Sequence, residues 1–421
     1  MIQFWAQRLY QTTVTSDVAG LHIEDTVAAF LAGRFTTDGK ALASLSLDST
    51  RIGDRAAIAA AIVRLTECDD IHVASCITPG SVAVPIALAY SADNHEDHIE
   101  RAVHAGYAAG IQLGRALGGV NALASGCWPT LFVAPVMAAV TASVARGATA
   151  DTLAHAIALS LAASAARIGR PSGTPSGRWY LFADAVTRGT RAAHAASRGF
   201  RGDLALLTDP WLAAQTGYSD ANLAPIEEGG DADSISGTGF KPFSTARQGA
   251  NAILAFQQLL VEIGDPRAIE RIDVAVPAIH LPLLTRAIVP FDRLSTFSNL
   301  SYQLGCAALS PETLYDTDRS HPPADEVLKF AQRVAISGDA ELDALLPHAW
   351  GARVAVTISG KLLQAEVIES EFDGHAVGLR KQLHQKWQRL LSPSDFALVA
   401  NMAKEGHQKR SAQRALMQLI R

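Results

Sequence analysis

An acidic pair followed closely by a histidine is the part of the sequence best suited to chemistry. Cys68-Asp69-Asp70-Ile71-His72 is followed at once by Thr78-Pro79-Gly80-Ser81 and an apolar, alanine-rich run. Carboxylates and an imidazole cost free energy near a packed core, so a chain that keeps them there often uses them. A Pro-Gly turn would start a buried helix at Ser81, whose open N–H groups favour an anion. The segment predicts a site for an anionic substrate such as a carboxylate, or equally well a loop whose aspartates cap a helix.

Composition excludes several classes of protein. At 421 residues the chain exceeds what one core usually serves, so two domains are the default. Hydrophobic residues make up 48% and charged residues 18%, which indicates a large interior. The net charge of −5 and the lack of a Lys/Arg cluster argue against a nucleic-acid partner. Four scattered cysteines without CxxC spacing indicate neither a disulfide framework nor a zinc site, and they fit a reducing cytoplasm.

Targeting and cofactor motifs are also missing from the sequence. The first residues lack the basic start and apolar run of a signal peptide. The most apolar run, residues 131–145, is shorter than the roughly 18 residues that a membrane span needs. No HExxH, DxDxDG or GxxxxGK[ST] pattern occurs. We therefore expect a cytoplasmic protein that has no membrane segment and uses no metal or nucleotide.

The elements that must position the acidic segment are predicted to be helices. From about residue 16 to residue 201, apolar residues recur at helical spacing with alanine between them, and no fixed repeat is present. Small side chains let helices approach closely, so we expect one interlocked bundle. The run at 131–145, interrupted by Pro135, Thr141 and Ser143, predicts a core helix within it.

The pattern changes after a stretch of linker composition at residues 224–239. Residues 271–277, 333–336 and 352–359 alternate like strands, and residues 360–368 complete a hairpin with the last of them. The sequence therefore predicts a mainly α fold with two parts. These are a large, alanine-rich, all-helical domain (residues 1–240 with 394–421) and a smaller α+β lid domain (residues 241–393).

Seven short motifs occur along the chain in a fixed order. Each of them alone carries little information. They are Glu24-Asp25-Thr26; Cys68-Asp69-Asp70-Ile71-His72 with Pro79-Gly80-Ser81; Gly106-Tyr107 with Leu113-Gly114-Arg115; Gly126-Cys127-Trp128-Pro129-Thr130; Arg178–Gly189 with Gly199-Phe200; Phe240-Lys241-Pro242-Phe243; and Ser301-Tyr302-Gln303 with Ala307-Ala308-Leu309.

In this order and spacing, the motifs resemble the MmgE/PrpD family over most of the chain. That family includes 2-methylcitrate dehydratase, cis-aconitate decarboxylase and iminodisuccinate epimerase. The resemblance implies a helical body with an α+β lid, a small carboxylated substrate, a homodimer and chemistry without a cofactor.

The chain departs from the family at its usual histidines. Thr78 replaces the histidine before the proline that follows the acidic box, and Trp128 replaces that of the family's Gly-Phe-His-Pro-Thr motif. The lysine that opens the later helix is Arg178, the tyrosine of Ser-x-Gln-Tyr is Leu304, and the histidine beyond Lys241 is absent. The acidic pair, Lys241 and the positive charge at Arg178 remain, so the match to the family's acid–base set is partial.

The resemblance implies reactions that remove or add a proton beside a carboxylate. Such a step needs a base with a pKa near neutral, donors for the oxyanion and cations for the carboxylates. His72 is the best base by type, since imidazole titrates near pH 7 and Asp70 can orient it. A satisfied, non-catalytic histidine is an equally good interpretation. Lys241 and Arg247 would clamp a carboxylate, or form an interdomain salt bridge.

Two sets of site residues follow. Thr78 can donate a hydrogen bond but is no base near pH 7, and Trp128 would reduce the polar capacity of the pocket. The predicted catalytic residues are His72, Asp70 and Lys241. The predicted substrate-binding residues are Asp69, Thr78, Tyr107, Trp128, Arg178, Tyr180 and Arg247.

The function predicted at this stage is a cofactor-independent lyase that catalyses elimination or hydration next to a carboxylate. The first alternative is an epimerase or isomerase that works through the same proton abstraction and tolerates the missing histidines better. The second is a family member that binds a ligand or scaffolds a partner without catalysis. A small carboxylated substrate and a homodimer are the expected partners.

Overall fold

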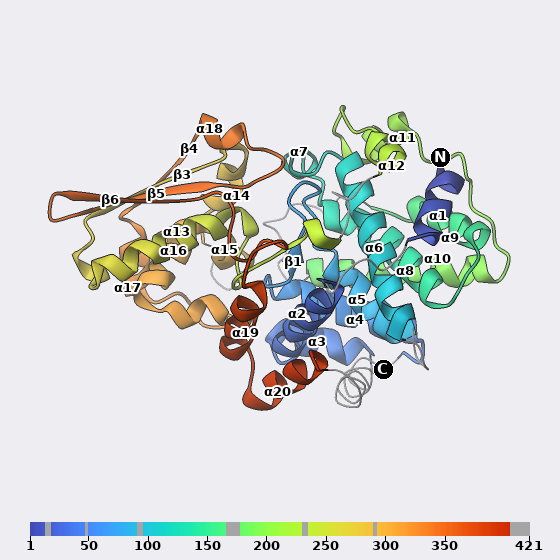
Figure 1. The fold of residues 1–421 in the computed structure, drawn as a ribbon, viewed down its shortest axis with the longest axis horizontal. Helices are drawn as coiled ribbons and strands as arrows, with labels where there is room; N and C mark the ends of the chain where they lie inside the picture. The colour runs from blue at the N-terminus through green and yellow to red at the C-terminus, as the bar shows by residue number, and fades with distance from the viewer. Residues whose placement is uncertain are drawn as a thin grey trace. The chain divides into compact units, whose positions relative to one another are not determined.

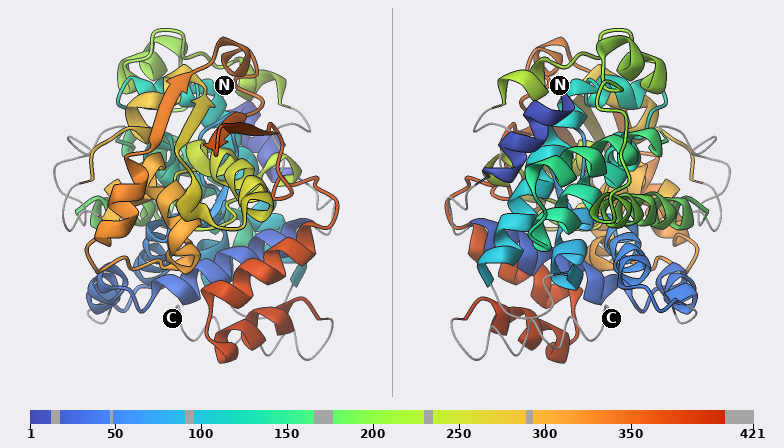
Figure 2. Two further views of the ribbon diagram at one scale, coloured as in Figure 1. Left: turned by 90° about the vertical axis from the view of Figure 1, so that its left-hand side faces the viewer. Right: turned by 90° about the vertical axis from the view of Figure 1, so that its right-hand side faces the viewer.

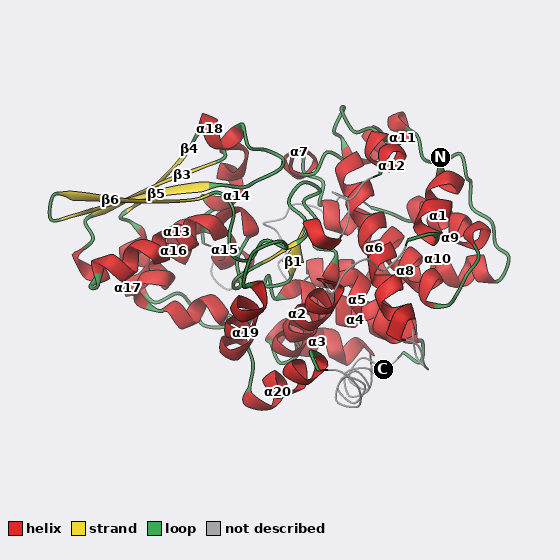
Figure 3. Cartoon of the chain, viewed as in Figure 1, coloured by secondary structure: helices red, strands yellow, loops and turns green. Residues whose placement is uncertain are grey.

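The computed structural model describes residues 1–12, 18–46, 49–90, 96–165, 177–229, 235–288 and 293–404. The chain divides into two compact units, Met1–Gly239 with Leu391–Arg421 and Phe240–Leu390 (Figure 1). Helices predominate in the described ranges, and the strands form small sheets (Figure 3). The predicted mainly α fold with a smaller α+β part is confirmed. The predicted helical tail beyond residue 404 lies outside the described residues.

The first unit is built almost entirely of helices. Its helices are α1 (Ile2–Tyr10), α2 (Val18–Gly33), α3 (Thr37–Ser46), α4 (Ile52–Leu65), α5 (Gly80–Tyr90), α6 (Glu96–Ala116), α7 (Val120–Ala124), α8 (Pro129–Ala145), α9 (Ala150–Ala162), α10 (Gly177–Ser197), α11 (Asp209–Thr216), α12 (Ala224–Glu228) and α20 (Pro393–Met402). Its strands are β1 (Asp70–Ile71) and the start of β2 (Gly239–Phe240), where the first unit passes into the second.

Helix α8 is the centre of this bundle, as the apolar run predicted. Every residue from Pro129 to Ala145 is buried, and a helix that is apolar on all sides must be surrounded by others. Helices α5, α6, α9 and α10 pack around it. Gly189 lets α10 come close, because a Cβ there would lie 2.1 Å from the carbonyl oxygen of Pro135. No helix in the described ranges is both long and apolar enough to cross a membrane.

The stretch predicted as a linker is partly ordered. Residues 224–239 contain α12 and the 3-10 turn η2 (Ile235–Gly237), while residues 230–234 lie outside the described part. Pro225 lies in the first turn of α12, where its missing N–H costs no hydrogen bond. The linker-like composition of this stretch therefore did not predict the short helix α12.

The second unit combines helices with a sheet. Its helices are α13 (Arg247–Ile263), α14 (Leu281–Leu284), α15 (Arg293–Ser298), α16 (Leu300–Leu309), α17 (Asp325–Ala331), α18 (Ala340–Asp343) and α19 (Leu379–Leu390), with 3-10 turns η3 (Pro266–Ala268), η4 (Ala278–His280) and η5 (Pro311–Tyr315). Its strands are β3 (Arg271–Val276), β4 (Val334–Gly338), β5 (Ala352–Ile358) and β6 (Lys361–Val367).

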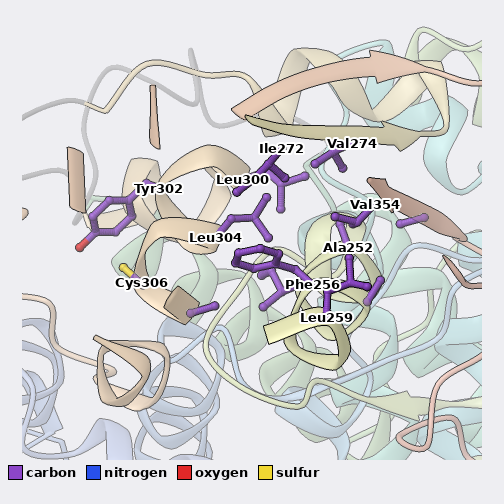
Figure 4. Packing of buried hydrophobic residues seen from close by; sticks show 14 of the residues in the cluster. Ala252, Phe256, Leu259, Ile272, Val274, Leu300, Tyr302, Leu304, Cys306 and Val354 are labelled. Carbon is purple, nitrogen blue, oxygen red and sulfur yellow. The ribbon is translucent and has the colours of Figure 1, made fainter. Parts of the chain in front are cut away.

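The sheet has the order β4-β3-β5-β6. Strand β3 is parallel to β4 and antiparallel to β5, and β5 forms a hairpin with β6, as its sequence predicted. Alternate residues of β3 are buried, which is typical of a sheet covered on one face. Helices α13 and α16 pack against the sheet (Figure 2; Figure 4). The apolar core of this unit lies between them, around Phe256, Ile272 and Leu304.

Candidate active site

Strand β1 places Asp70 at the centre of a buried hydrogen-bond network. One carboxylate oxygen, Oδ1, accepts a hydrogen bond from the backbone N–H of Gly80 at 2.9 Å. The other, Oδ2, accepts from the hydroxyl of Tyr107 at 2.5 Å and lies 2.9 Å from Nδ1 of His22. Gly80 begins α5, Tyr107 belongs to α6 and His22 to α2. The side chain of Asp70 therefore ties three helices together.

This network has little room for any other atom. A Cβ on residue 80 would lie 2.7 Å from the Tyr107 hydroxyl and 2.8 Å from Oδ2 of Asp70, so glycine is required there. Burial, and then the charge of Asp70, raises the pKa of Tyr107 well above its ordinary value, so the phenol stays a donor. Three donors engage Asp70, and this geometry favours a positioning role for it and for Tyr107.

His72 is held by the tight turn that follows β1. Its backbone N–H donates to the carbonyl of Ile77 at 2.9 Å. Its Nδ1 accepts the backbone N–H of Ser75 at 3.2 Å and lies 2.8 Å from the Ser75 hydroxyl. Because a backbone N–H can only donate, Nδ1 is an acceptor and the ring proton sits on Nε2. In this arrangement the basic nitrogen already has a donor, which weighs against the predicted role of His72 as the base.

An acidic residue that the sequence analysis missed, Glu67, lies directly before the Cys68-Asp69-Asp70-Ile71-His72 motif. Glu67 Oε2 is 2.9 Å from Nη1 of Arg64, and Oδ1 of Asp69 is 3.5 Å from the same nitrogen. All three side chains are buried. Glu67 has a φ of 52°, in the left-handed region that a residue with a side chain seldom adopts. Backbone strain of this kind concentrates at functional sites.

Arg64 carries its full positive charge within this cluster. Burial by itself would lower its pKa, but the carboxylates of Asp69 and Glu67 outweigh burial and raise the pKa above its ordinary value. Arg64 lies in the last turn of α4, so the end of that helix presents the guanidinium to the turn that holds Glu67. The result is a buried cation flanked by two carboxylates.

Aromatic rings form a wall beside this cluster. The guanidinium carbon of Arg64 lies 5.8 Å from the centroid of the Trp128 ring, and that of Arg178 lies 4.5 Å from the same centroid. Trp179 stands at 6.3 Å from Trp128 in a T-shaped arrangement, and Phe182 stacks on Trp128 at 5.6 Å. Pro129 begins α8 and leaves Trp128 in the cap position. Two cations therefore lie close to the Trp128 ring, a favourable arrangement for an electron-rich ring.

Thr78 lies close to the segment that carries Trp128. Its backbone N–H donates to the Thr130 hydroxyl at 3.3 Å, and its own hydroxyl lies 3.3 Å from that of Ser81. Thr130 is two residues beyond Trp128, so the two residues that replace family histidines belong to adjoining segments. The structure thus brings together Asp69, Trp128 and Arg178 among the predicted residues, with Thr78 nearby.

Other predicted residues lie elsewhere. Tyr180 projects outward from α10 with 56% of its surface exposed, and the structure does not bring it to this cluster. Lys241 and Arg247 belong to the second unit, where both are buried. Arg247 donates to Asn251 at 3.0 Å and to Asp373 at 3.2 Å. Burial lowers the pKa of Arg247, an effect that Asp373 partly opposes.

The described side chains contain no group of three or more histidines, cysteines, aspartates or glutamates placed to hold a metal ion. The cluster around Arg64 instead offers carboxylates that can exchange a proton and guanidinium groups that can hold an oxyanion. We refer to Arg64, Glu67, Asp69, Trp128 and Arg178 as the arginine–tryptophan cluster.

Comparison with known proteins gives one match. The family model of the MmgE/PrpD N-terminal domain matches residues 14–225, half of the chain and a stretch that contains the whole arginine–tryptophan cluster. No curated protein matches the chain. The chain belongs to the MmgE/PrpD family.

Proposed function

We propose that this protein is a cofactor-independent lyase that catalyses elimination or hydration next to a carboxylate on a small polycarboxylate. The observation that supports it is the arginine–tryptophan cluster, in which buried carboxylates and guanidinium groups surround one aromatic wall. MmgE/PrpD membership supports the same reaction class.

Four members of the cluster have a part in the proposed reaction. Glu67 removes the proton beside the substrate carboxylate, since a positioned carboxylate can act as a general base. Arg64 and Arg178 hold the substrate's carboxylates and stabilise the negative charge that develops as the proton leaves. The Trp128 ring keeps water away from this charge, which strengthens its electrostatic interactions with Arg64 and Arg178.

An epimerase is the second candidate, and a specific observation favours it. Elimination needs an acid beside the leaving group, whereas epimerisation only removes a proton and returns one. Thr78 and Trp128 occupy two of the positions where the family carries imidazoles, and neither is an acid near pH 7. The predicted contributions of Lys241 and Arg247, a homodimer and a cytoplasmic location remain proposals.

Proton NMR in D2O tests the proposal. The purified protein is incubated with a panel of di- and tricarboxylates, hydroxy acids and imino acids. Appearance or loss of an alkene signal would support the lyase. Exchange at the carbon next to a carboxylate, without net product, would support the epimerase. An unchanged spectrum with every compound of the panel would contradict both the lyase and the epimerase, and it would favour a non-catalytic binding role.

Variants of two different glutamates test whether the activity belongs to the cluster. Glu67→Gln removes the proposed base and should lower the rate by about 10²–10⁴-fold, the usual contribution of general base catalysis. Glu228→Gln changes an exposed glutamate of the same unit and should keep the wild-type rate. Equal rates in both variants would remove Glu67 from the mechanism.

A further inference from the structure

Cys76 has an unusual backbone conformation, which it shares with the proposed base. Its φ is 54° and that of Glu67 is 52°, and in the described part of the first unit no other residue except glycine has a positive φ. Side chains disfavour this left-handed region, so residues stay there only where the surrounding structure fixes them. Cys76 is also buried, with 7% of its surface exposed. The acidic pair therefore lies between two strained residues.

Helix α6 holds the turn that contains Cys76. The backbone N–H of His72 closes this turn on the carbonyl of Ile77 at 2.9 Å. A Cβ at Gly114 of α6 would lie 2.8 Å from the Cβ of Ser75 and 3.0 Å from Cγ2 of Ile77. The residues on both sides of Cys76 thus pack against α6, so its position is fixed by its neighbours.

The path of the chain brings Cys76 to the arginine–tryptophan cluster. Thr78, two residues after Cys76, donates its backbone N–H to the Thr130 hydroxyl at 3.3 Å. Trp128, two residues before Thr130, has its ring centroid 5.8 Å from the guanidinium carbon of Arg64. Two short steps along the chain therefore connect Cys76 to this cation.

Arg64 has a donor available beside the thiol of Cys76. Its side chain is buried, and its Nε has no hydrogen-bond partner within the described ranges. Burial lowers the pKa of Arg64, and the groups whose charges raise it are Asp69, Glu67 and then Cys76. The electrostatic effect agrees with the path of the chain. An arginine N–H that a ligand can use and a thiol therefore belong to the same small region.

The proposed elimination requires an acid that protonates the leaving hydroxyl. Thr78 and Trp128 stand where the family carries histidines, and neither is an acid near pH 7. A thiol has an ordinary pKa of about 8.5, so it holds its proton at pH 7 and can give it up in a reaction. A guanidinium beside a thiol stabilises the thiolate that remains after the proton has left.

We propose that the thiol of Cys76 is the general acid that protonates the leaving hydroxyl of the substrate. This inference rests on the proposed lyase, in which Glu67 removes the proton from carbon. As that proton leaves, the C=C bond forms, the C–O bond breaks, and the hydroxyl takes the thiol proton and departs as water. Glu67 is then protonated and Cys76 is a thiolate, and transfer of one proton through the solvent restores both groups.

Elimination of water and of chloride tests this role, because chloride leaves as an anion and needs no proton. The probes are the hydroxy acid that the wild-type protein dehydrates in the NMR panel and its chloro analogue. Cys76→Ser keeps the shape of the side chain but replaces the thiol by a far weaker acid. It should lower the rate of water elimination by about 10²–10⁴-fold and keep the rate of chloride elimination. An unchanged rate of water elimination, or an equal fall for both probes, would overturn the role of Cys76.

Two further variants guard against effects on folding. Cys306→Ser changes a buried thiol of the second unit and should keep both rates. If Cys76→Ser does not fold, Cys76→Ala removes the same proton and should give the same two results. Retention of water elimination in Cys76→Ala would likewise overturn the role of Cys76.

Glu67→Gln separates this inference from the proposed base. Both eliminations begin with removal of the proton from carbon, so this variant should lose both. Retention of both rates in Glu67→Gln, with loss of water elimination alone in Cys76→Ser, would remove Glu67 from the mechanism and support Cys76 as the acid. A wild-type protein that forms no alkene from any hydroxy acid would overturn the lyase and the role of Cys76 together.

Discussion

One buried histidine, His280, should make the stability of this protein depend on pH. His280 ends the 3-10 turn η4 and has 2% of its surface exposed. Neither of its ring nitrogens has a partner among the described residues, and its ring meets that of Trp350 edge-on at 4.9 Å. Burial, and then the charge of Arg247, lowers the pKa of His280 from 6.5 to about 3.

The lowered pKa fixes the direction of the effect. Between pH 6.5 and pH 3 the unfolded chain holds a proton on this imidazole that the folded chain does not hold. Unfolding therefore takes up a proton, and the free energy of unfolding falls as the pH is lowered. The contribution is complete above pH 6.5 and is lost progressively below it.

The size of the effect follows from the unfolded pKa. From pH 7 to pH 5, His280 alone should lower the free energy of unfolding by about 2 kcal/mol, at roughly 1.4 kcal/mol per pH unit below 6.5. This figure changes little with the folded pKa, as long as that pKa stays below pH 4. It is a large part of the stability of an ordinary domain.

Urea unfolding followed by circular dichroism at pH 7, 6 and 5 measures this loss. Carboxylates elsewhere also titrate, so the decisive quantity is the difference between wild type and His280→Leu. Leucine keeps an apolar contact with Trp350 and removes the titrating group. His348→Gln, at an exposed histidine of the same unit, should follow the wild type. Parallel pH dependence in wild type and His280→Leu would show that this imidazole is protonated as easily in the folded chain as in water, which would refute the argument.

The network around Asp70 gives two further predictions, both measured by urea unfolding. Asp70→Ala leaves the Gly80 N–H and the Tyr107 hydroxyl without their acceptor and should cost about 3–5 kcal/mol, whereas Asp220→Ala, at an exposed aspartate, should cost little. A loss below about 1 kcal/mol would contradict the positioning role of Asp70. Gly80→Ala forces a methyl group against buried oxygens and should cost about 1–3 kcal/mol, whereas Gly20→Ala makes only an ordinary contact of 3.9 Å with Glu24 and should be neutral or stabilising. Equal effects of the two alanines would contradict the crowding at residue 80.

Apolar patterning was enough to predict most of the fold. A helix such as α8 is buried on all sides, so its sequence is apolar throughout and its polar interruptions do not mislead. Strand β3 alternates because only one of its faces is covered. The error came at residues 224–228, which belong to the stretch of linker composition but form a short helix with Pro225 in its first turn.

The site was predictable only in part, because its geometry depends on turns. Glu67 lies one residue before the motif that drew attention to the aspartates, and only its left-handed backbone turns it toward Arg64. No periodic pattern signals such a conformation in a residue other than glycine. His72 was a reasonable base by residue type. The turn that returns the Ser75 N–H to its ring could not be read from local sequence.

The acidic pair shows how adjacent residues of one type come to have different roles. Asp70 begins an extended strand, and side chains of successive residues point to opposite sides of extended backbone. Asp69 accordingly meets Arg64, while Asp70 meets His22, Tyr107 and the start of α5. The two carboxylates therefore meet different groups: Asp69 lies beside Arg64, and Asp70 accepts from Tyr107 and Gly80. One belongs to the arginine–tryptophan cluster, and the other holds the helices that keep this cluster in place.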